Sequence, residues 1–257
     1  SPEAFLAVVN KNTKAVIPVH VSGRAADMEA IMAVAKRNNI FVVEDAAEAF
    51  MSKHKGKHLG TFGKAGCFSF SAHKTITTGQ GGVIVTDDSR LYTRLKELKD
   101  QGRPAKGTGG DDLHKSVGYN FKFTDLQAAV GLGQLTYLKP RIKRAKEIYK
   151  RYLKNLKGVS SIRLFHFDID GGEVPQWTDA IVERRDGFDA YLRANRIDCR
   201  RYWFPLHTQA PYRLPDKNFS NSTRLSPKAL WLPSAFTLSD SDIDSVCKLI
   251  KKWNRRN

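Results

Sequence analysis

Residues 40–48 read IFVVEDAAE, and this stretch decides the fold of the first half of the 257-residue chain. The apolar run from Ile40 to Val43 is typical of a strand buried in a parallel sheet. Two acids and then small residues follow it, as at a turn from a strand into a helix. Ligands of such sheets bind beyond the carboxyl ends of the strands, so Asp45 is predicted to lie at a ligand-binding edge. The alternative is that Asp45 only caps the next helix.

The stretch FSFSAHKTITTGQGG, residues 68–82, has the same character. A strand is predicted over Gly66 to Phe70, and Lys74 follows just past its end. The flanking hydroxyls suit a phosphate, and the glycines allow a ligand to approach closely. Most loop lysines are solvated charges, but desolvation or a cationic neighbour turns a lysine amine into a nucleophile. Both conditions are available at the ligand edge of a sheet.

The first half alternates short strand patterns with helical ones, which predicts an α/β fold with a mainly parallel sheet. The other elements expected there are a strand at Ala15 to Val19, a helix capped by Asp27, a strand at Gly82 to Thr86, a helix from Ser89 to Gly102, and a helix begun by the capping box of Thr124 and Gln127.

The second half has a different character and predicts a smaller α+β domain. A long basic helix is expected from Pro140 to Gly158, with the domain boundary inside it, giving domains 1–145 and 146–257. Beyond it we expect strands at 161–168, 177–182 and 198–203, a helix at 186–195, a Pro-containing loop over 205–233, and a last helix from 239 to 253.

Composition narrows the class of protein. Apolar residues make up 41% and charged residues 27%, a globular balance. No apolar run approaches the roughly 20 residues that cross a bilayer. The net charge of +17 favours anionic partners. Much of it lies between Lys139 and Lys157, which fits the solvated face of a helix. Nucleic acid is an unlikely ligand, since few aromatic residues are interleaved there for stacking.

The cysteines indicate the compartment. Cys67, Cys199 and Cys247 are odd in number, and no close pair has metal-ligand spacing. We therefore expect reduced thiols in a cytoplasmic protein, and no metal site.

Asp45 and Lys74, both at strand ends of one parallel sheet, meet the requirements of pyridoxal 5'-phosphate chemistry. A lysine forms a Schiff base with this cofactor. A carboxylate keeps the pyridine nitrogen protonated, so that the ring accepts electrons from the substrate.

Three motifs in order make the interpretation specific: EDAAE at 44–48, FSFSAHKTITTGQGG at 68–82, and GYNFKFTDLQAA at 118–129. With PVH at 18–20 and FPLH at 204–207, the chain resembles the DegT/DnrJ/EryC1/StrS sugar aminotransferases. The resemblance covers nearly the whole chain. It implies a fold-type I pyridoxal-phosphate-dependent transferase with pyridoxal 5'-phosphate as cofactor.

The resemblance also implies roles for single residues. Lys74 matches the Schiff-base lysine, Asp45 the partner of the ring nitrogen, and Glu48 a residue near the cofactor's 3-hydroxyl. Ser69 matches a phosphate-binding hydroxyl. Asn120 matches an asparagine that reaches the cofactor of the neighbouring subunit, which implies a homodimer with shared active sites.

Two histidines are open to a second interpretation. His207 and His20 are candidates for substrate contact. A structural role is the alternative for each: His207 would satisfy a loop carbonyl, and His20 would support the interior.

The implied reaction is transfer of an amino group, usually from L-glutamate, to a keto-sugar nucleotide. Residues 199–207, CRRYWFPLH, look most like the branch that acts on 4-keto-6-deoxy sugars, as in perosamine or viosamine synthesis. Family members are longer and carry part of the phosphate site in an earlier segment, so the chain is expected to be N-terminally truncated. The alternatives are a sugar dehydratase relative, in which histidine replaces the lysine, and a non-enzymatic polyanion-binding protein on the same scaffold.

Overall fold

The computed structural model describes residues 1–104 and 112–255. The chain forms two compact units. The first comprises Ser1–Lys139 together with Ile169–Val174, and the second comprises Pro140–Asp168 and the chain from Pro175 onward. The division thus lies at Lys139 and Pro140, and a short segment of the later chain belongs to the first unit.

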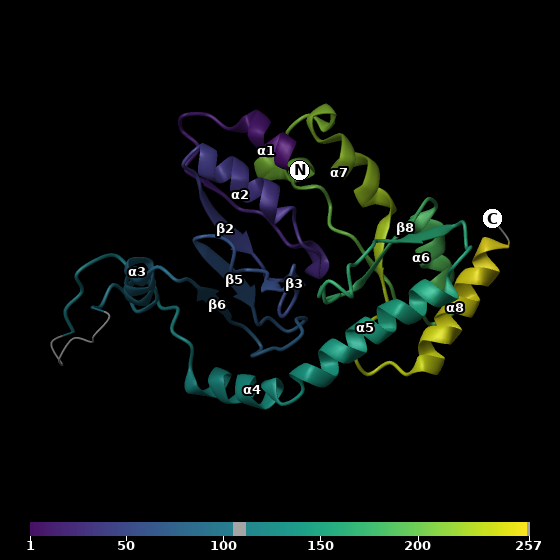
Figure 1. Cartoon of the computed structure of the whole chain (residues 1–257). Helices are drawn as coiled ribbons and strands as arrows, with labels where there is room; N and C mark the ends of the chain where they lie inside the picture. The colour runs from purple at the N-terminus through teal and green to yellow at the C-terminus, as the bar shows by residue number, and fades with distance from the viewer. Residues whose placement is uncertain (105–111, 256–257) are drawn as a thin grey trace. The chain divides into compact units, whose positions relative to one another are not determined.

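The first unit contains α1 (Pro2–Val8), β1 (Ala15–Val16), α2 (Met28–Arg37), β2 (Phe41–Asp45), β3 (Lys53–His54), β4 (Lys57–His58), β5 (Ala65–Ser69), β6 (Gly82–Val85), α3 (Ser89–Lys99) and α4 (Asp125–Leu135). Its main sheet has the order β1-β2-β5-β6 (Figure 1). β1 pairs with β2 and β2 with β5 in parallel, while β6 runs antiparallel to β5. The predicted mainly parallel sheet is confirmed.

Local signals in the sequence set the helix starts of the first unit. The Asp27 side chain accepts from the amide of Ala30 and so caps α2. Thr124 and Gln127 form the predicted capping box of α4. The apolar face of α2 packs on β2 through a buried cluster: Met28, Ala35, Ile40 and Val42. This packing fixes β2, and with it the carboxyl end that carries the candidate site.

The second unit contains most of α5 (Leu138–Asn155), then β7 (Ile162–Leu164), β8 (Thr178–Val182), α6 (Arg185–Ala194), β9 (Arg200–Arg201), α7 (Ser220–Leu225), β10 (Ala229–Leu232) and α8 (Asp240–Asn254). Its antiparallel sheet has the order β7-β8-β10-β9. The core is apolar and comes from α5, α6, α8 and the sheet; its fully buried members include Tyr152, Phe188, Leu192, Leu230, Leu232, Ile243 and Ile250.

Several details differ from the sequence-based expectation. Among the described residues, no helix lies between β2 and β3, so Asp45 does not cap one: turns lead from it to β3. α7 lies inside the expected Pro-containing loop. Pro140 does not begin α5 but lies in its first turn, where a missing N–H costs nothing. β10 lies inside the expected Pro-containing loop, and all four of its residues are buried between β8 and β9. A four-residue apolar run flanked by Pro227 and Pro233 is too short for periodicity to reveal.

Within the described part of the chain, no helix is both long enough and apolar enough to cross a membrane.

Candidate active site

Two parallel strands of the first unit end at one edge of the sheet. Asp45 is the last residue of β2 and lies in register with Cys67 of the neighbouring strand β5. Ser69 is the last residue of β5. Because the strands are parallel, their carboxyl ends meet at the same edge, where ligands of such sheets bind. The structure therefore brings a carboxylate and a hydroxyl to the predicted place.

Lys74 lies in the loop between β5 and β6. Its amide donates to the carbonyl of Ser71 at 3.1 Å, and the amide of Thr78 donates to the carbonyl of Phe70 at 2.9 Å, so the loop folds back on the end of β5. The Lys74 side chain is only 13% exposed, and its Nζ lies 3.5 Å from Oε1 of Glu48. The loop thus holds an amine in a largely desolvated place, as the sequence predicted.

Glu48 connects this amine to a segment that sequence analysis did not single out. Its Oε2 accepts from the backbone N–H of Ser22 at 2.9 Å. Ser22 is fully buried and has a φ of 54°, a left-handed conformation that a serine adopts only at a cost. That backbone turns an amide toward the carboxylate. The PVH motif and the candidate His20 lie just before this segment in the sequence, but Ser22 itself carried no sequence signal.

Asp45 is half-buried, and its Oδ1 accepts from the amide of Ala47 at 3.0 Å. This bond fixes the carboxylate at the turn after β2. Burial raises the pKa of the Cys67 thiol, and the negative charge of Asp45 raises this pKa further, by a smaller amount. This thiol is therefore neutral at physiological pH and is a poor nucleophile.

Glu44, the residue before Asp45, forms a buried pair with His20. His20 and Glu44 are both fully buried, and Nε2 of His20 lies 2.9 Å from Oε2 of Glu44. Nδ1 of His20 accepts from the amide of Ala26, so both ring nitrogens bond to the protein. Glu44 also accepts from the amides of Gly60, Phe62 and Gly63. This geometry suits a supporting role for His20, and its predicted substrate contact stays a prediction.

The buried carboxylate of Glu44 is ionised despite its surroundings. Burial acts to raise its pKa, but the hydrogen bonds from His20, Gly63 and Gly60 outweigh burial and hold the pKa below the usual value. An ionised Glu44 therefore fixes the loop after β4 against β2.

The remaining predicted residues lie in different places. Ser69 donates to Oγ of Ser71 at 3.2 Å and accepts from its amide at 3.3 Å. Asn120 is exposed and forms an isolated antiparallel bridge with Asp100. His207 belongs to the second unit, where it is buried, lies 3.0 Å from Oδ1 of Asp216, and stacks on Phe219.

The residues at the sheet edge fit pyridoxal 5'-phosphate. The Lys74 amine, which could react with an aldehyde, lies beside the Glu48 carboxylate, and the hydroxyls of Ser69 and Ser71 are adjacent to each other and could donate to a phosphate. Oδ1 of Asp45 accepts from Ala47, and this carboxylate would balance the positive charge of a protonated ring nitrogen. Lys74, Asp45 and Ser69 are thus the residues that would hold the cofactor.

The fold and this edge of the sheet define a pyridoxal-phosphate-dependent transferase. Comparison with known proteins identifies the family. The model of the DegT/DnrJ/EryC1/StrS aminotransferase family matches residues 1–251. The chain belongs to this family of pyridoxal-phosphate-dependent aminotransferases.

Individual relatives agree with the family. The chain is 35% identical to GDP-perosamine synthase of Escherichia coli O157:H7 over 249 residues, and the match covers 95% of this chain and 67% of the relative. It is 33% identical to GDP-perosamine synthase of Vibrio cholerae, with 95% and 68% covered. The crystal structure of S. venezuelae DesV matches with a TM-score of 0.92 and 28% identity over 100% of this chain and 69% of DesV. The chain thus spans about two thirds of these proteins, and the predicted fold type is confirmed.

Proposed function

We propose that the protein transfers an amino group, with L-glutamate as donor, to the keto group of a sugar carried on a nucleotide diphosphate. The observation that carries the proposal is the nearly buried Lys74 amine beside Glu48, at the sheet edge where β2 ends in Asp45. Two relatives with about one third identity are GDP-perosamine synthases, which favours a 4-keto-6-deoxy sugar on GDP.

The chain's own groups have separate roles in this proposal. When bound, pyridoxal 5'-phosphate supplies a ring that withdraws electrons from the carbon bearing the amine. The Lys74 amine moves the proton to and from that carbon. The Asp45 carboxylate stabilises positive charge on the ring nitrogen, and Glu48 orients the Lys74 amine through their ion pair. The hydroxyl of Ser69 binds phosphate.

We also propose a homodimer with shared active sites, in which Asn120 contacts the neighbouring subunit's cofactor. Asn120 stands between two large apolar residues that are mostly exposed, Tyr119 at 54% and Phe121 at 71%, and Leu126 on the following helix α4 is 79% exposed. Tyr119 and Phe121 stack at 5.2 Å between ring centroids. Exposed apolar groups of this size mark surfaces that bind other proteins. Sedimentation of the protein with and without Asn120→Asp tests the association.

A cytoplasmic location is part of the same proposal. Cys67, Cys199 and Cys247 are free thiols, and the last two are buried. Free thiols are the usual state of cysteine in reducing compartments.

The decisive experiment compares amino transfer by the purified protein with GDP-linked 4-keto and nucleotide-linked 3-keto sugars, in the presence of L-glutamate and pyridoxal 5'-phosphate. Lys74→Ala is expected to lower the rate by roughly 10²–10⁴-fold, the usual contribution of a positioned proton-transfer group. Lys14→Ala, at an exposed lysine, is the matched control. Equal rates for the two variants would show that Lys74 is not the cofactor lysine. Turnover of the 3-keto substrate alone would contradict the sugar assignment.

A further inference from the structure

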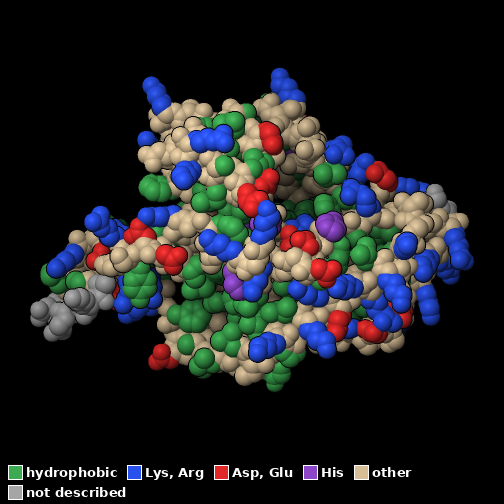
Figure 2. Space-filling view, in the orientation of Figure 1, with side chains coloured by type: hydrophobic (Ala, Val, Ile, Leu, Met, Phe, Trp, Pro, Cys, Tyr) green, Lys and Arg blue, Asp and Glu red, His purple; other side chains and the backbone are tan. Residues whose placement is uncertain are grey.

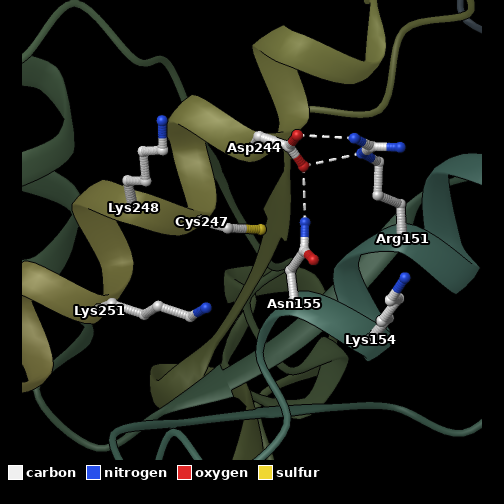
Figure 3. Close-up of a pocket in the computed structure, with 7 residues that line it drawn as sticks. All are labelled: Arg151, Lys154, Asn155, Asp244, Cys247, Lys248 and Lys251. Atoms are coloured by element: carbon white, nitrogen blue, oxygen red, sulfur yellow. Dashed lines mark hydrogen bonds and ion pairs between the residues drawn. The ribbon is translucent and has the colours of Figure 1, made fainter.

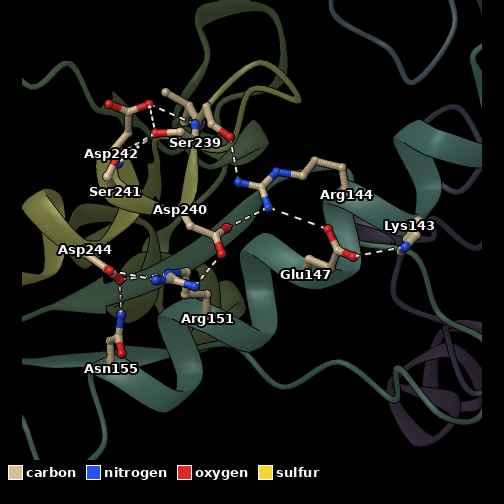
Figure 4. A network of polar contacts seen from close by, with 11 residues as sticks. Lys143, Arg144, Glu147, Arg151, Asn155, Ser239, Asp240, Ser241, Asp242 and Asp244 are labelled. Atoms are coloured by element: carbon tan, nitrogen blue, oxygen red, sulfur yellow. Dashed lines mark hydrogen bonds and ion pairs between the residues drawn. The ribbon is translucent and has the colours of Figure 1, made fainter.

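A second charged feature lies between α5 and α8 of the second unit. Arg151 donates to Asp244 through Nε at 2.8 Å and Nη2 at 2.6 Å, and Asn155 donates to the same carboxylate at 2.7 Å. Figure 4 shows this group as part of a chain of ion pairs that continues through Asp240 to Arg144. Bidentate ion pairs between arginine and a carboxylate are geometrically specific. They fix the spacing of the two helices.

A cavity of about 240 Å³ opens beside this pair. Its lining comes from α5 and α8 alone, as Figure 3 shows: Arg151, Lys154, Asn155, Asp244, Cys247, Lys248 and Lys251. Helical periodicity explains the arrangement, because residues three and four apart share a helix face. None of the candidate active-site residues lines this cavity.

The charges around the cavity do not balance. Asp244 is its only carboxylate, and Arg151 already neutralises it. Among the described residues, Lys154, Lys248 and Lys251 form no ion pair and no hydrogen bond. In Figure 2 many Lys and Arg side chains, with some Asp and Glu among them, lie over the region of α5 and α8. Three exposed lysines and Arg151 thus border one small cavity whose lining holds a single carboxylate, and their positive charge attracts an anion to it.

The floor of the cavity adds no competing charge. The Cys247 side chain points between the helices in Figure 3 and is buried. Burial, which outweighs the opposing hydrogen bond from Asn155, raises the pKa of this thiol to about 11. A neutral thiol does not repel an anion.

We propose that this cavity binds a diphosphate group through the ammonium groups of Lys154, Lys248 and Lys251. Phosphate oxygens are strong acceptors, and lysine is a common phosphate ligand. The volume is below the roughly 300–1,000 Å³ of pockets that enclose drug-sized ligands, so the site suits the charged group rather than a whole nucleotide sugar. Inorganic pyrophosphate and a nucleoside diphosphate share this chemistry.

Isothermal titration of the full chain with inorganic pyrophosphate tests the site. We expect saturable binding that weakens at least about tenfold in the triple variant Lys154→Gln, Lys248→Gln, Lys251→Gln, because three charge-assisted contacts are lost. A second titration adds GDP. If GDP competes with pyrophosphate, the site also binds a nucleoside diphosphate. If GDP does not compete, the site is restricted to pyrophosphate. In both cases pyrophosphate binds in the cavity.

The control variant removes the same charge elsewhere in the second unit. Lys157, Lys217 and Lys252 are exposed and do not line the cavity, and Lys252 is the immediate neighbour of Lys251 on α8. The triple change of these three to Gln is expected to leave pyrophosphate affinity within about twofold of the unchanged chain, since solvent and salt screen surface charges that do not line the cavity. Equal losses in the two triple variants, or no saturable binding, would overturn the proposal. Thermal unfolding of both variants establishes that they are folded.

Discussion

The Nζ of Lys74 lies 3.5 Å from Oε1 of Glu48, and the two side chains are only 13% and 14% exposed. The pair joins the β5–β6 loop to the turn after β2. Since Glu48 also accepts from the backbone of Ser22, one carboxylate holds three segments together. The amine is thus positioned by the protein itself.

This pair makes a testable contribution to stability. In a double-mutant cycle of Lys74→Ala and Glu48→Gln, we expect a coupling energy of about 0.5–1.5 kcal/mol, because a mostly buried pair is weakly screened. Urea unfolding of the cofactor-free protein measures it. The matched control is the exposed pair of Lys55 and Glu29, at 2.6 Å, whose coupling should be smaller. Stronger coupling in the exposed pair would contradict the expectation.

Asp45→Asn separates a role in catalysis from a role in holding the turn after β2. The amide oxygen of Asn can still accept from Ala47, but the negative charge is lost. We expect the amino-transfer rate to fall by roughly 10²–10³-fold, the usual effect of removing one electrostatic stabiliser. The free energy of unfolding should change by less than about 1 kcal/mol. A loss of stability with unchanged turnover would instead assign Asp45 to holding the turn after β2.

Glu44 makes the first unit sensitive to acid. Its folded pKa lies below the unfolded value, so its stabilisation is complete above about pH 4.5 and is lost as the pH falls through the folded pKa. Glu44→Gln should cost about 1–3 kcal/mol at neutral pH, because an amide NH₂ then faces backbone donors. It should also flatten the fall in stability below pH 4.5. The exposed carboxylate of Glu183 gives the control, Glu183→Gln, which should leave the acid profile unchanged.

The substitution of glycine by alanine is expected to have opposite effects on stability at two positions. A Cβ on Gly66 in β5 would lie 1.9 Å from the carbonyl oxygen of Gly60, whereas a Cβ on Gly133 in α4 meets nothing within 4 Å. Gly66→Ala should therefore destabilise the protein by about 1–3 kcal/mol or more, since the backbone must move. Gly133→Ala should stabilise it by about 0.5–1 kcal/mol through helix propensity. Denaturation midpoints of the two variants decide; equal shifts would contradict this packing around β5.

Local patterns predicted most of the elements correctly. The capping box of Thr124 and the cap by Asp27 are local events and could be seen in the sequence. β10 could not, because its four buried residues become a strand only when β8 and β9 pair with them on both sides. The parallel pairing of β1 and β2 was predictable, since two short apolar runs separated by the helical pattern of α2 favour it.

The sequence alone determined the type of chemistry. An acid follows one apolar run, and a lysine and a Gly-rich turn follow another. This order predicts a parallel sheet with its reactive groups at one edge. The tertiary structure decided how those groups are held. The amide of Ser22 reaches Glu48 across 26 positions of the chain, and the side chains of α5 and α8 meet around an unbalanced cluster of lysines. Such contacts depend on how distant segments pack, and no spacing along the chain encodes them.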